Sequence, residues 1–511
     1  MITFFVRRFL TSAFVVLVSS FIMYVLVDLA IDPIADLRTS SAFNKEELIQ
    51  QRVALLNLDE SVIVRYFDWL KGASGCVVGD CDLGANWYNR KLVTDLIAGA
   101  IGTTLQLVTA ATVLAILCGC AVGIVSALRQ YTGFDYSITF LSFLLYSLPV
   151  FWVAVLAKEF IAIDFNDFLR DPQIPIWFMA GAALITGIFL SAAVGGSILA
   201  RLRTFAIAAG VIVGICLYLN ATDWFAEPSL GIGVVAVAAV GFAFLMTTLS
   251  TGLKNRRALY SALTVAGIGV ALYYPMFTYW GSVDESWLML AGLAVVGVLV
   301  GVVVGFAWGG PDWTRSARTA ALTTLPIGAM LVIERALRAW PEYVDAVGGR
   351  PIKTSGERTP NLEGSFWIQS LDAFTHLLLP SLTLVLISFA GYTRYSRAST
   401  LEVLNQDYIR TARSKGLTER TVVMRHAFRN ALLPLASIVP VDIITLVGGA
   451  VITERVFNWN GMGNLFINSL GDNQQYPVMA YILIIGILAV VANFVADLVY
   501  AVLDPRIRVN A

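Results

Sequence analysis

Residues 407–434 read DYIRTARSKGLTERTVVMRHAFRNALLP and form a basic segment that lies between long apolar runs. Asn405 and Asp407 are favourable residues for the start of a short helix. Gly416 suits the left-handed position that follows the last turn of a helix, and Thr418 can cap a second helix. The segment therefore predicts a helix, a sharp turn and a second helix. Its basic residues are Arg410, Arg413, Lys415, Arg420, Arg425 and Arg429.

An ordinary basic loop on the cytoplasmic side of a membrane is the alternative interpretation of this segment. Such a loop explains the positive charges. It explains the ordered pattern of helix, glycine and helix less well. We therefore treat the segment as the candidate functional site.

The composition of the whole chain points to a membrane protein. Of the 511 residues, 58% are hydrophobic and 14% are charged, and the mean hydropathy is +0.75. Soluble proteins are nearer a quarter charged. The formal net charge is zero, so there is no overall basic field that would attract nucleic acid. These values argue against a soluble enzyme, a disordered chain and a nucleic-acid binder.

Twelve apolar runs reach the length of roughly 20 residues that a spanning helix needs. They lack the alternation that is typical of barrel strands, so the predicted fold class is an all-α polytopic membrane protein. The first run follows Arg7 and Arg8. It is long and lacks an Ala-x-Ala site, which favours a retained helix over a cleaved signal peptide. The runs cover about 9–29, 99–127, 137–158, 174–199, 204–220, 229–250, 259–276, 287–308, 319–337, 373–394, 431–453 and 478–502.

Lysine and arginine in the short loops predict the orientation in the cell membrane. With the N-terminus in the cytoplasm, the basic short loops, the C-terminus and the segment 395–430 all lie inside. Residues 30–95 then form an external loop. The external loop 338–370 carries four basic residues, which is tolerable because long loops follow the rule only weakly.

Two of the five cysteines, Cys76 and Cys81, lie in a polar external stretch. Disulfides persist outside the cell, and we expect these two residues to form one; the alternative is a pair of free thiols. The sequence holds two histidines. A cysteine pair without further histidine or cysteine ligands is not a zinc site, so we expect no metal site.

The segments 407–417 and 425–434 resemble the EAA loop of ABC importer permeases, and most of all the dipeptide/oligopeptide (DppB/OppB-type) subfamily. In that family the loop forms a coupling helix that docks in a groove of the ATPase subunit. The glycine of the motif matches Gly416 and its alanine matches Ala412, whereas the leading glutamate is absent. The resemblance implies a coupling loop made by Asp407, Tyr408, Arg410, Thr411, Ala412, Arg413, Lys415, Gly416 and Leu417.

Further matches extend the resemblance over about 1–163 and 371–511. They include Gly79–Gly84, Ser147–Trp152 and Thr453–Gly463. In the last of these, Asn460 stands where family members usually have proline. The resemblance implies a six-helix permease core whose N-terminal part is 1–163 and whose C-terminal part is 371–511.

Residues 164–370 form an insertion relative to that family. Six of the twelve apolar runs lie in it, and only an even number returns the chain to the outside for the fourth core helix. The insertion has few intramembrane charges, which favours a peripheral role over a transport path. Its small residues suit close helix packing, for example Gly181 and Gly292 with Gly297.

The core runs carry Asp442 and Asp497. They either line the translocation path or pair locally. No Gly-x4-Gly-Lys-Ser/Thr pattern occurs in the chain, so it is not the ATPase, and we expect neither an enzyme nor a cofactor.

The resemblance also implies a set of partners. These are a second homologous permease in a heterodimer, two ATP-binding ABC subunits, an external substrate-binding protein, a peptide substrate and membrane lipid, with no nucleic acid. Three alternatives remain open: a non-peptide substrate such as nickel, a secondary transporter, and a membrane scaffold that works through the inserted helices. A secondary transporter predicts inverted repeats and broken helices with midplane charges, and the sequence shows neither clearly.

Overall fold

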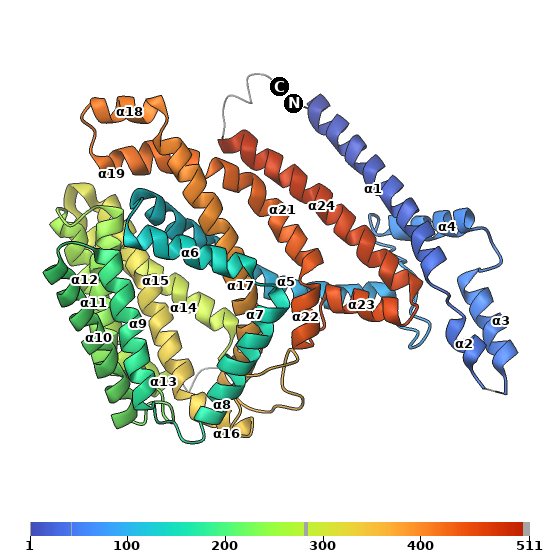
Figure 1. Ribbon diagram of the computed structural model, residues 1–511, viewed down its shortest axis with the longest axis horizontal. Coiled ribbons are helices and arrows are strands. Elements are labelled where there is room, and N and C mark those ends of the chain that lie inside the picture. The colour runs from blue at the N-terminus through green and yellow to red at the C-terminus, as the bar shows by residue number, and fades with distance from the viewer. Residues whose placement is uncertain (1, 42, 281–284, 504–511) are drawn as a thin grey trace.

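The computed structural model describes residues 2–41, 43–280 and 285–503 (Figure 1). The regular elements in these ranges are helices, and the single pairing of extended backbone is an isolated bridge between Ala85 and Leu92. Within the same ranges, nine helices or helical stretches are long and apolar enough to cross a membrane, or ten with one bent pair. The predicted all-α polytopic class is confirmed.

The core helices pack as long neighbours. Gly119 and Gly123 bring α5 close to α17, because a β-carbon on Gly119 would lie 2.7 Å from that of Tyr392. Helix α24 packs against both α1 and α21. The core helices are α1 (Ile2–Ala30), α5 (Val93–Leu128), α6 (Gly133–Ser147), α7 (Val150–Leu156), α17 (Phe366–Leu404), α21 (Leu433–Gly449) and α24 (Gln475–Leu503).

The third predicted span, 137–158, is wrong as a single straight helix. The chain bends by 102° between Ser147 and Val150. Pro149 lacks the amide hydrogen that a helix interior needs, and the residue before a proline is pushed to an extended conformation. Leu148 is indeed extended, with φ of −81° and ψ of 130°. The π-helix η1 (Ala157–Ile163) and α8 (Asp164–Phe168) continue this bent segment.

Short helices gather at the end of the core that lies away from α18 (Asp407–Ser414) (Figure 1). Helices α2 (Ala35–Thr39), α3 (Lys45–Leu56) and α4 (Val62–Gly75) form a cap. Tyr66 and Trp69 of α4 pack against α1. Arg65 of the cap makes two hydrogen bonds to the Asp28 carboxylate of α1, at 2.8 and 3.1 Å. The other short helices are α16 (Trp340–Ala346), α22 (Val451–Phe457) and α23 (Met462–Gly471).

The predicted insertion folds as a helical body beside the predicted core helices (Figure 1). Helices α9 and α10 form one pair, while α11, α12, α14 and α15 pack among themselves. The 52-residue apolar stretch from Trp287 to Arg338 is two helices, α14 and α15, that pack along each other. The inserted helices are α9 (Ile176–Val194), α10 (Ile198–Ala221), α11 (Gly231–Ser250), α12 (Arg256–Ala271), α13 (Tyr273–Trp280), α14 (Trp287–Gly309) and α15 (Trp313–Arg338), with the 3-10 turn η2 (Gly310–Asp312).

Glu334 is a buried carboxylate of the insertion that accepts three hydrogen bonds. Glu334 is inaccessible to solvent and accepts hydrogen bonds from the Tyr273 hydroxyl at 2.6 Å, the Arg338 guanidinium at 3.0 Å and the Leu230 amide at 2.6 Å. A buried charge that is paired and hydrogen-bonded in this way fits a structural role. The cluster ties α11, α13 and α15 together.

The insertion contacts the core at opposite ends, and one hydrogen bond at each end illustrates this. Glu285 accepts a hydrogen bond from the Trp367 indole of α17 at 2.6 Å. The Arg129 guanidinium, after α5, donates to the Ala193 carbonyl of α9 at 3.2 Å. The inserted body is therefore attached at both ends of the core helices.

One of the three glycines that the sequence suggested takes part in helix packing in the insertion. Gly181 and Gly292 have nothing within 4 Å of a built β-carbon, so the prediction that they pack closely is wrong, whereas a β-carbon on Gly297 would lie 3.8 Å from that of Thr324 on α15. Gly301 and Gly305 face α15 more closely, and a β-carbon on Gly305 would meet the backbone of Ala317. Small residues four apart let two helix backbones approach closely in a membrane.

This contact leads to a matched pair of substitutions. We expect Gly305→Leu to separate α14 from α15 and to destabilise the protein by about 1–3 kcal/mol, as overpacking does. Gly292→Leu on the same helix meets open space and should leave stability unchanged. Thermal unfolding of both variants in one detergent tests this, and equal melting temperatures would contradict the assigned helix face.

Candidate functional site: residues 405–431

The segment 405–431 forms a compact unit beyond the end of α17. Helix α18 is followed by a turn at Gly416, and the chain returns through α19 (Glu419–Thr421), the π-helix η3 (Val422–Ala427) and α20 (Phe428–Ala431). Figure 1 places α18 at the same end of the molecule as the start of α1 and the end of α24. The predicted order of helix, turn and helix is present.

The predicted N-caps of α18 are wrong. Gln406 occupies the cap position without a side-chain hydrogen bond, and Asp407 is already the first helical residue. Asn405 instead ends α17, and its side-chain amide donates to the Leu401 carbonyl at 3.0 Å. The 39-residue α17 continues into the loop, so Asn405 closes one helix rather than opening the next.

A small apolar core holds α18 in place. Ile409 is fully buried and Ala412 is nearly so. Both pack against Val422 and Ala427 of η3. Because Ile409 and Ala412 are three residues apart, they share one face of the helix. The opposite face is left for solvent or a partner.

Gly416 forms the turn for a conformational reason. Its φ is +75°, and nothing lies within 4 Å of a built β-carbon. The position therefore requires the left-handed backbone that glycine adopts easily, while space for a side chain is open. Thr418 then caps α19, as predicted, by accepting the Thr421 amide at 3.4 Å.

A salt bridge spans this turn. The Arg413 guanidinium donates two hydrogen bonds to the Glu419 carboxylate, at 3.2 and 2.7 Å. Arg413 lowers the pKa of Glu419, and Glu419 raises the pKa of Arg413. Both side chains are largely exposed, so solvent screens their attraction.

The depressed pKa of Glu419 sets a pH window for the turn. The stabilisation is present above the ordinary value of 4.5 and is lost as the pH falls through the lower folded-state pKa. We expect hydrogen exchange in the turn, corrected for intrinsic rates, to give constant protection from about pH 8 to about pH 5.5. Glu419→Gln should cost no more than about 0.5 kcal/mol, as for an exposed ion pair. Loss of protection around neutral pH would contradict this.

The outward surface of the loop carries most of the predicted coupling residues. Asp407 and Arg410 form an exposed pair at 3.5 Å. Tyr408 is partly exposed, and its hydroxyl accepts a hydrogen bond from the Asn430 amide at 2.8 Å, which fixes its orientation. Leu417 and Met424 add exposed apolar surface. The exposed residues of the predicted set are Asp407, Tyr408, Arg410, Thr411, Arg413, Lys415, Gly416 and Leu417, while Ala412 is buried.

Sequence reasoning missed two features of the site. Met424 is 60% exposed, and an apolar residue in an otherwise basic segment was the available signal. The second is a pair between Asp135 of α6 and Arg397 of α17, with hydrogen bonds of 2.7 and 2.9 Å. Ser126 of α5 adds a third hydrogen bond to Asp135 at 2.6 Å. Nothing local in the sequence relates Asp135 to the loop.

The two acidic residues proposed for the translocation path lie on different helices. Asp442 lies on α21, is half-buried and interacts with Tyr392 of α17. Asp497 lies on α24, and its side chain is outside the described residues. A role in the path stays a prediction for both residues.

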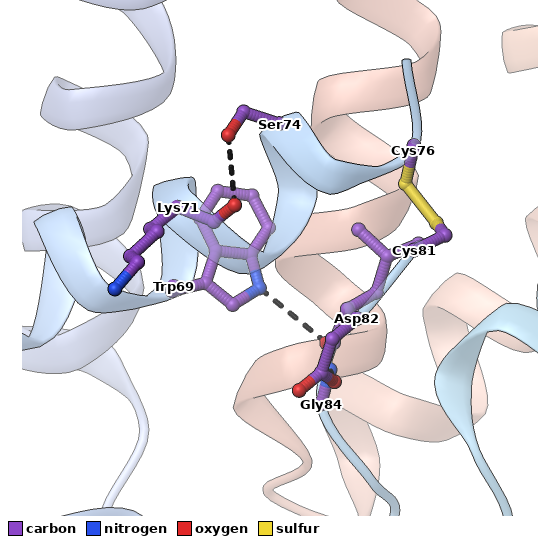
Figure 2. The surroundings of a disulfide bond; sticks show 8 residues. Trp69, Lys71, Ser74, Cys76, Cys81, Asp82 and Gly84 are labelled. Atoms are coloured by element: carbon purple, nitrogen blue, oxygen red, sulfur yellow. Dashed lines mark hydrogen bonds between the residues drawn. A yellow bond between two sulfur atoms is a disulfide. The ribbon is translucent and has the colours of Figure 1, made fainter. Parts of the chain in front are cut away.

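The cysteines that were predicted to pair, Cys76 and Cys81, are joined. A disulfide links Cys76, just after α4, to Cys81 (Figure 2). The remaining cysteines are free: Cys118, Cys120 and Cys216. In the described parts of the chain, no three His, Cys, Asp or Glu side chains gather as metal ligands.

Comparison with known proteins assigns the chain to a family. The family described as binding-protein-dependent transport system inner membrane component matches residues 343–509, and the N-terminal part of such components matches residues 1–108. The oligopeptide transport system permease protein OppB of Mycobacterium tuberculosis is 39% identical over 232 residues, which cover 44% of this chain and 69% of the relative. The chain belongs to this permease family.

Two other relatives of the permease match shorter stretches. The oligopeptide permease AppB of Bacillus subtilis is 44% identical over 155 residues, 30% of this chain and 48% of the relative. The dipeptide permease DppB of Escherichia coli is 42% identical over 139 residues, 27% of this chain and 41% of the relative. The family matches leave residues 109–342 uncovered, and this interval contains the inserted helices α9–α15.

Proposed function

We propose that this permease is the transmembrane subunit of an ATP-driven importer of peptides. ATP hydrolysis belongs to partner subunits, because the family consists of transport permeases rather than ATPases. The observation that carries the coupling role is the arrangement of α18: a buried core fixes one face of the helix, and Tyr408 and Arg410 are exposed on the rest of its surface. We propose the cell membrane as its location, with both termini and α18 in the cytoplasm.

The contacts around α18 make it a lever on the core helices. Helix α17 runs without interruption from its apolar part to Leu404. The Ser399 hydroxyl of α17 donates to the Ala431 carbonyl at 2.7 Å, which ties the returning chain to the same helix. Movement of the ATPase subunits would therefore shift α17 and α21 together. Coupling of this kind needs a partner that contacts α18 differently in two states of the pore.

Membership of the permease family supports two further partners. A second homologous permease would complete the path between the two chains, and an external substrate-binding protein would deliver peptide to the end that bears α2–α4 and α23. The names of the relatives specify oligopeptides and dipeptides, which favours peptides as the substrate class.

Co-purification from native membranes tests the proposal. We expect the tagged wild-type chain to recover two nucleotide-binding subunits and a second permease. Gly416→Trp should lose the ATPases, because the indole would project from the left-handed turn into open space. Gly416→Asn is the matched control, since asparagine tolerates this backbone conformation. Recovery of the ATPases with the tryptophan variant, or their absence from the wild type, would overturn the coupling role.

A further inference from the structure

The external cap contains a cavity of about 390 Å³ between α3, α4, the loop 82–85 and the start of α24. We call it the cap groove. This volume lies at the small end of the range of about 300–1,000 Å³ found for ligand pockets. Its walls combine aromatic and apolar side chains, including Trp69, Leu92 and Tyr476, with three charged residues. The coupling loop uses none of these residues.

The disulfide loop builds one wall of the cap groove. Figure 2 shows Trp69 on α4 pointing toward the loop that carries Asp82 and Gly84. The Trp69 indole donates a hydrogen bond to the Leu83 carbonyl at 3.4 Å. The loop passes so close to α4 that a β-carbon on Gly72 would lie 2.5 Å from the Asp82 carbonyl oxygen. The bridge between Cys76 and Cys81 closes the intervening turn. The wall is therefore fixed by covalent and close packing contacts.

Tyr476 closes the opposite side. Its ring lies where a β-carbon on Gly84 would be 2.7 Å away, and Gly84 has a φ of +87°. Only glycine meets both conditions easily. Arg65 and Asp82 line the same cavity as Tyr476.

Among the residues that the structure describes, the single cation of the cap groove, Arg65, already pairs with a carboxylate outside the groove, whereas the two carboxylates that line the groove are exposed. Arg65 is neutralised by Asp28 through its two terminal nitrogens. The Arg65 side chain is 9% exposed, and its Nε is buried without a hydrogen-bond partner among the described residues. Asp68 and Asp82 are exposed at the cavity. Asp82 uses one oxygen to accept the Gly84 amide at 2.9 Å. The groove thus offers carboxylates for a cation, and Arg65, which lines it, holds a buried donor without a partner among the described residues.

We propose that the cap groove binds the amino-terminal residue of a peptide. The α-ammonium group pairs with Asp68 and Asp82, and the first carbonyl oxygen accepts the hydrogen bond of Arg65 Nε. The side chain of that residue packs against Trp69 and Leu92. An amino terminus supplies a cation and an acceptor on the same residue, whereas a lysine side chain supplies only the cation. The substrate class rests on the proposed function.

Binding to the full chain in nanodiscs, without ATPases or binding protein, tests this site. The probes are tri-alanine, N-acetyl-tri-alanine and free alanine, measured by calorimetry. We expect tri-alanine to bind and the acetylated peptide to bind about tenfold more weakly or worse, because charged hydrogen bonds of this kind are the strong ones. Free alanine should show whether the peptide bond adds to binding.

Asp68→Asn and Asp82→Asn should each weaken tri-alanine binding about tenfold. Asparagine at position 82 keeps the oxygen that accepts the Gly84 amide. Asp80→Asn is the control, since it removes the same charge from the same loop without lining the groove. Equal binding of free and acetylated peptide, or equal effects of Asp80→Asn and Asp82→Asn, would overturn the proposal.

The two proposals fail separately. Absence of the ATPases from the purified wild-type complex, or their retention with Gly416→Trp, would refute the coupling role and leave the calorimetry unaffected. An intact complex that transports peptides, with no binding of tri-alanine to the nanodisc sample, would refute the cap groove alone.

Discussion

Asp135→Ala should lower the free energy of unfolding by about 3 kcal/mol, near the lower end of the cost of breaking a buried ion pair. Asp135 is 2% exposed and Arg397 is 26% exposed in this pair. The carboxylate also accepts hydrogen bonds from Ser126 and from the Tyr131 amide. Its removal leaves a half-buried guanidinium without its two hydrogen bonds on the helix that carries the coupling loop.

Thermal unfolding in detergent, calibrated by chemical denaturation, measures this effect. Asp407→Ala is the matched control, because the Asp407 side chain is 97% exposed and its loss should change stability by no more than about 0.5 kcal/mol. The double variant Asp135→Leu with Arg397→Met should recover much of the loss, since apolar residues often replace a buried pair without cost. Equal stability of Asp135→Ala and Asp407→Ala would show that the pair does not join α6 to α17.

The sequence predicts those features of the permease that depend on composition and local chemistry. Apolar length predicted the spanning helices, and a glycine followed by a capping threonine predicted the turn at Gly416. These features follow from the cost of unsatisfied backbone groups in lipid and from the backbone freedom of glycine. Both act within a few residues of the position concerned.

The remaining features depend on which segments meet. Asp135 and Arg397 are 262 residues apart, and neither sequence context identifies the other. The glycines of α14 recur with a spacing of four at 297, 301, 305 and 309, and all four lie against residues of α15. The spacing marks one face of α14, but the sequence does not say which helix packs on that face. The cap of α18 was mispredicted for the same reason, because the length of α17 decides whether Asn405 closes one helix or opens another.

The coupling loop should be most sensitive at Ile409. Ile409→Asp places an unpaired carboxylate in the apolar core formed with Ala412, Val422 and Ala427. Ile409 is fully buried, and an uncompensated buried charge costs several kcal/mol. The loop has few other apolar contacts, so we expect α18 to detach while the spanning helices stay folded. Hydrogen exchange should rise across residues 407–427 and stay unchanged in α5 and α17.

Ile409→Asp and the adjacent substitution Arg410→Asp should differ in how much ATPase is recovered with the tagged chain. Arg410→Asp changes the charge by two units at a side chain that is 70% exposed, so α18 should remain folded. If the ATPases recognise the fixed outer face of α18, Ile409→Asp abolishes their recovery with the tagged chain. Arg410→Asp then weakens recovery in a salt-dependent manner, because its contribution is electrostatic and screened. A chain with Ile409→Asp that retains both ATPases would mean that they bind elsewhere on the permease, since the folded helix is then not what they recognise.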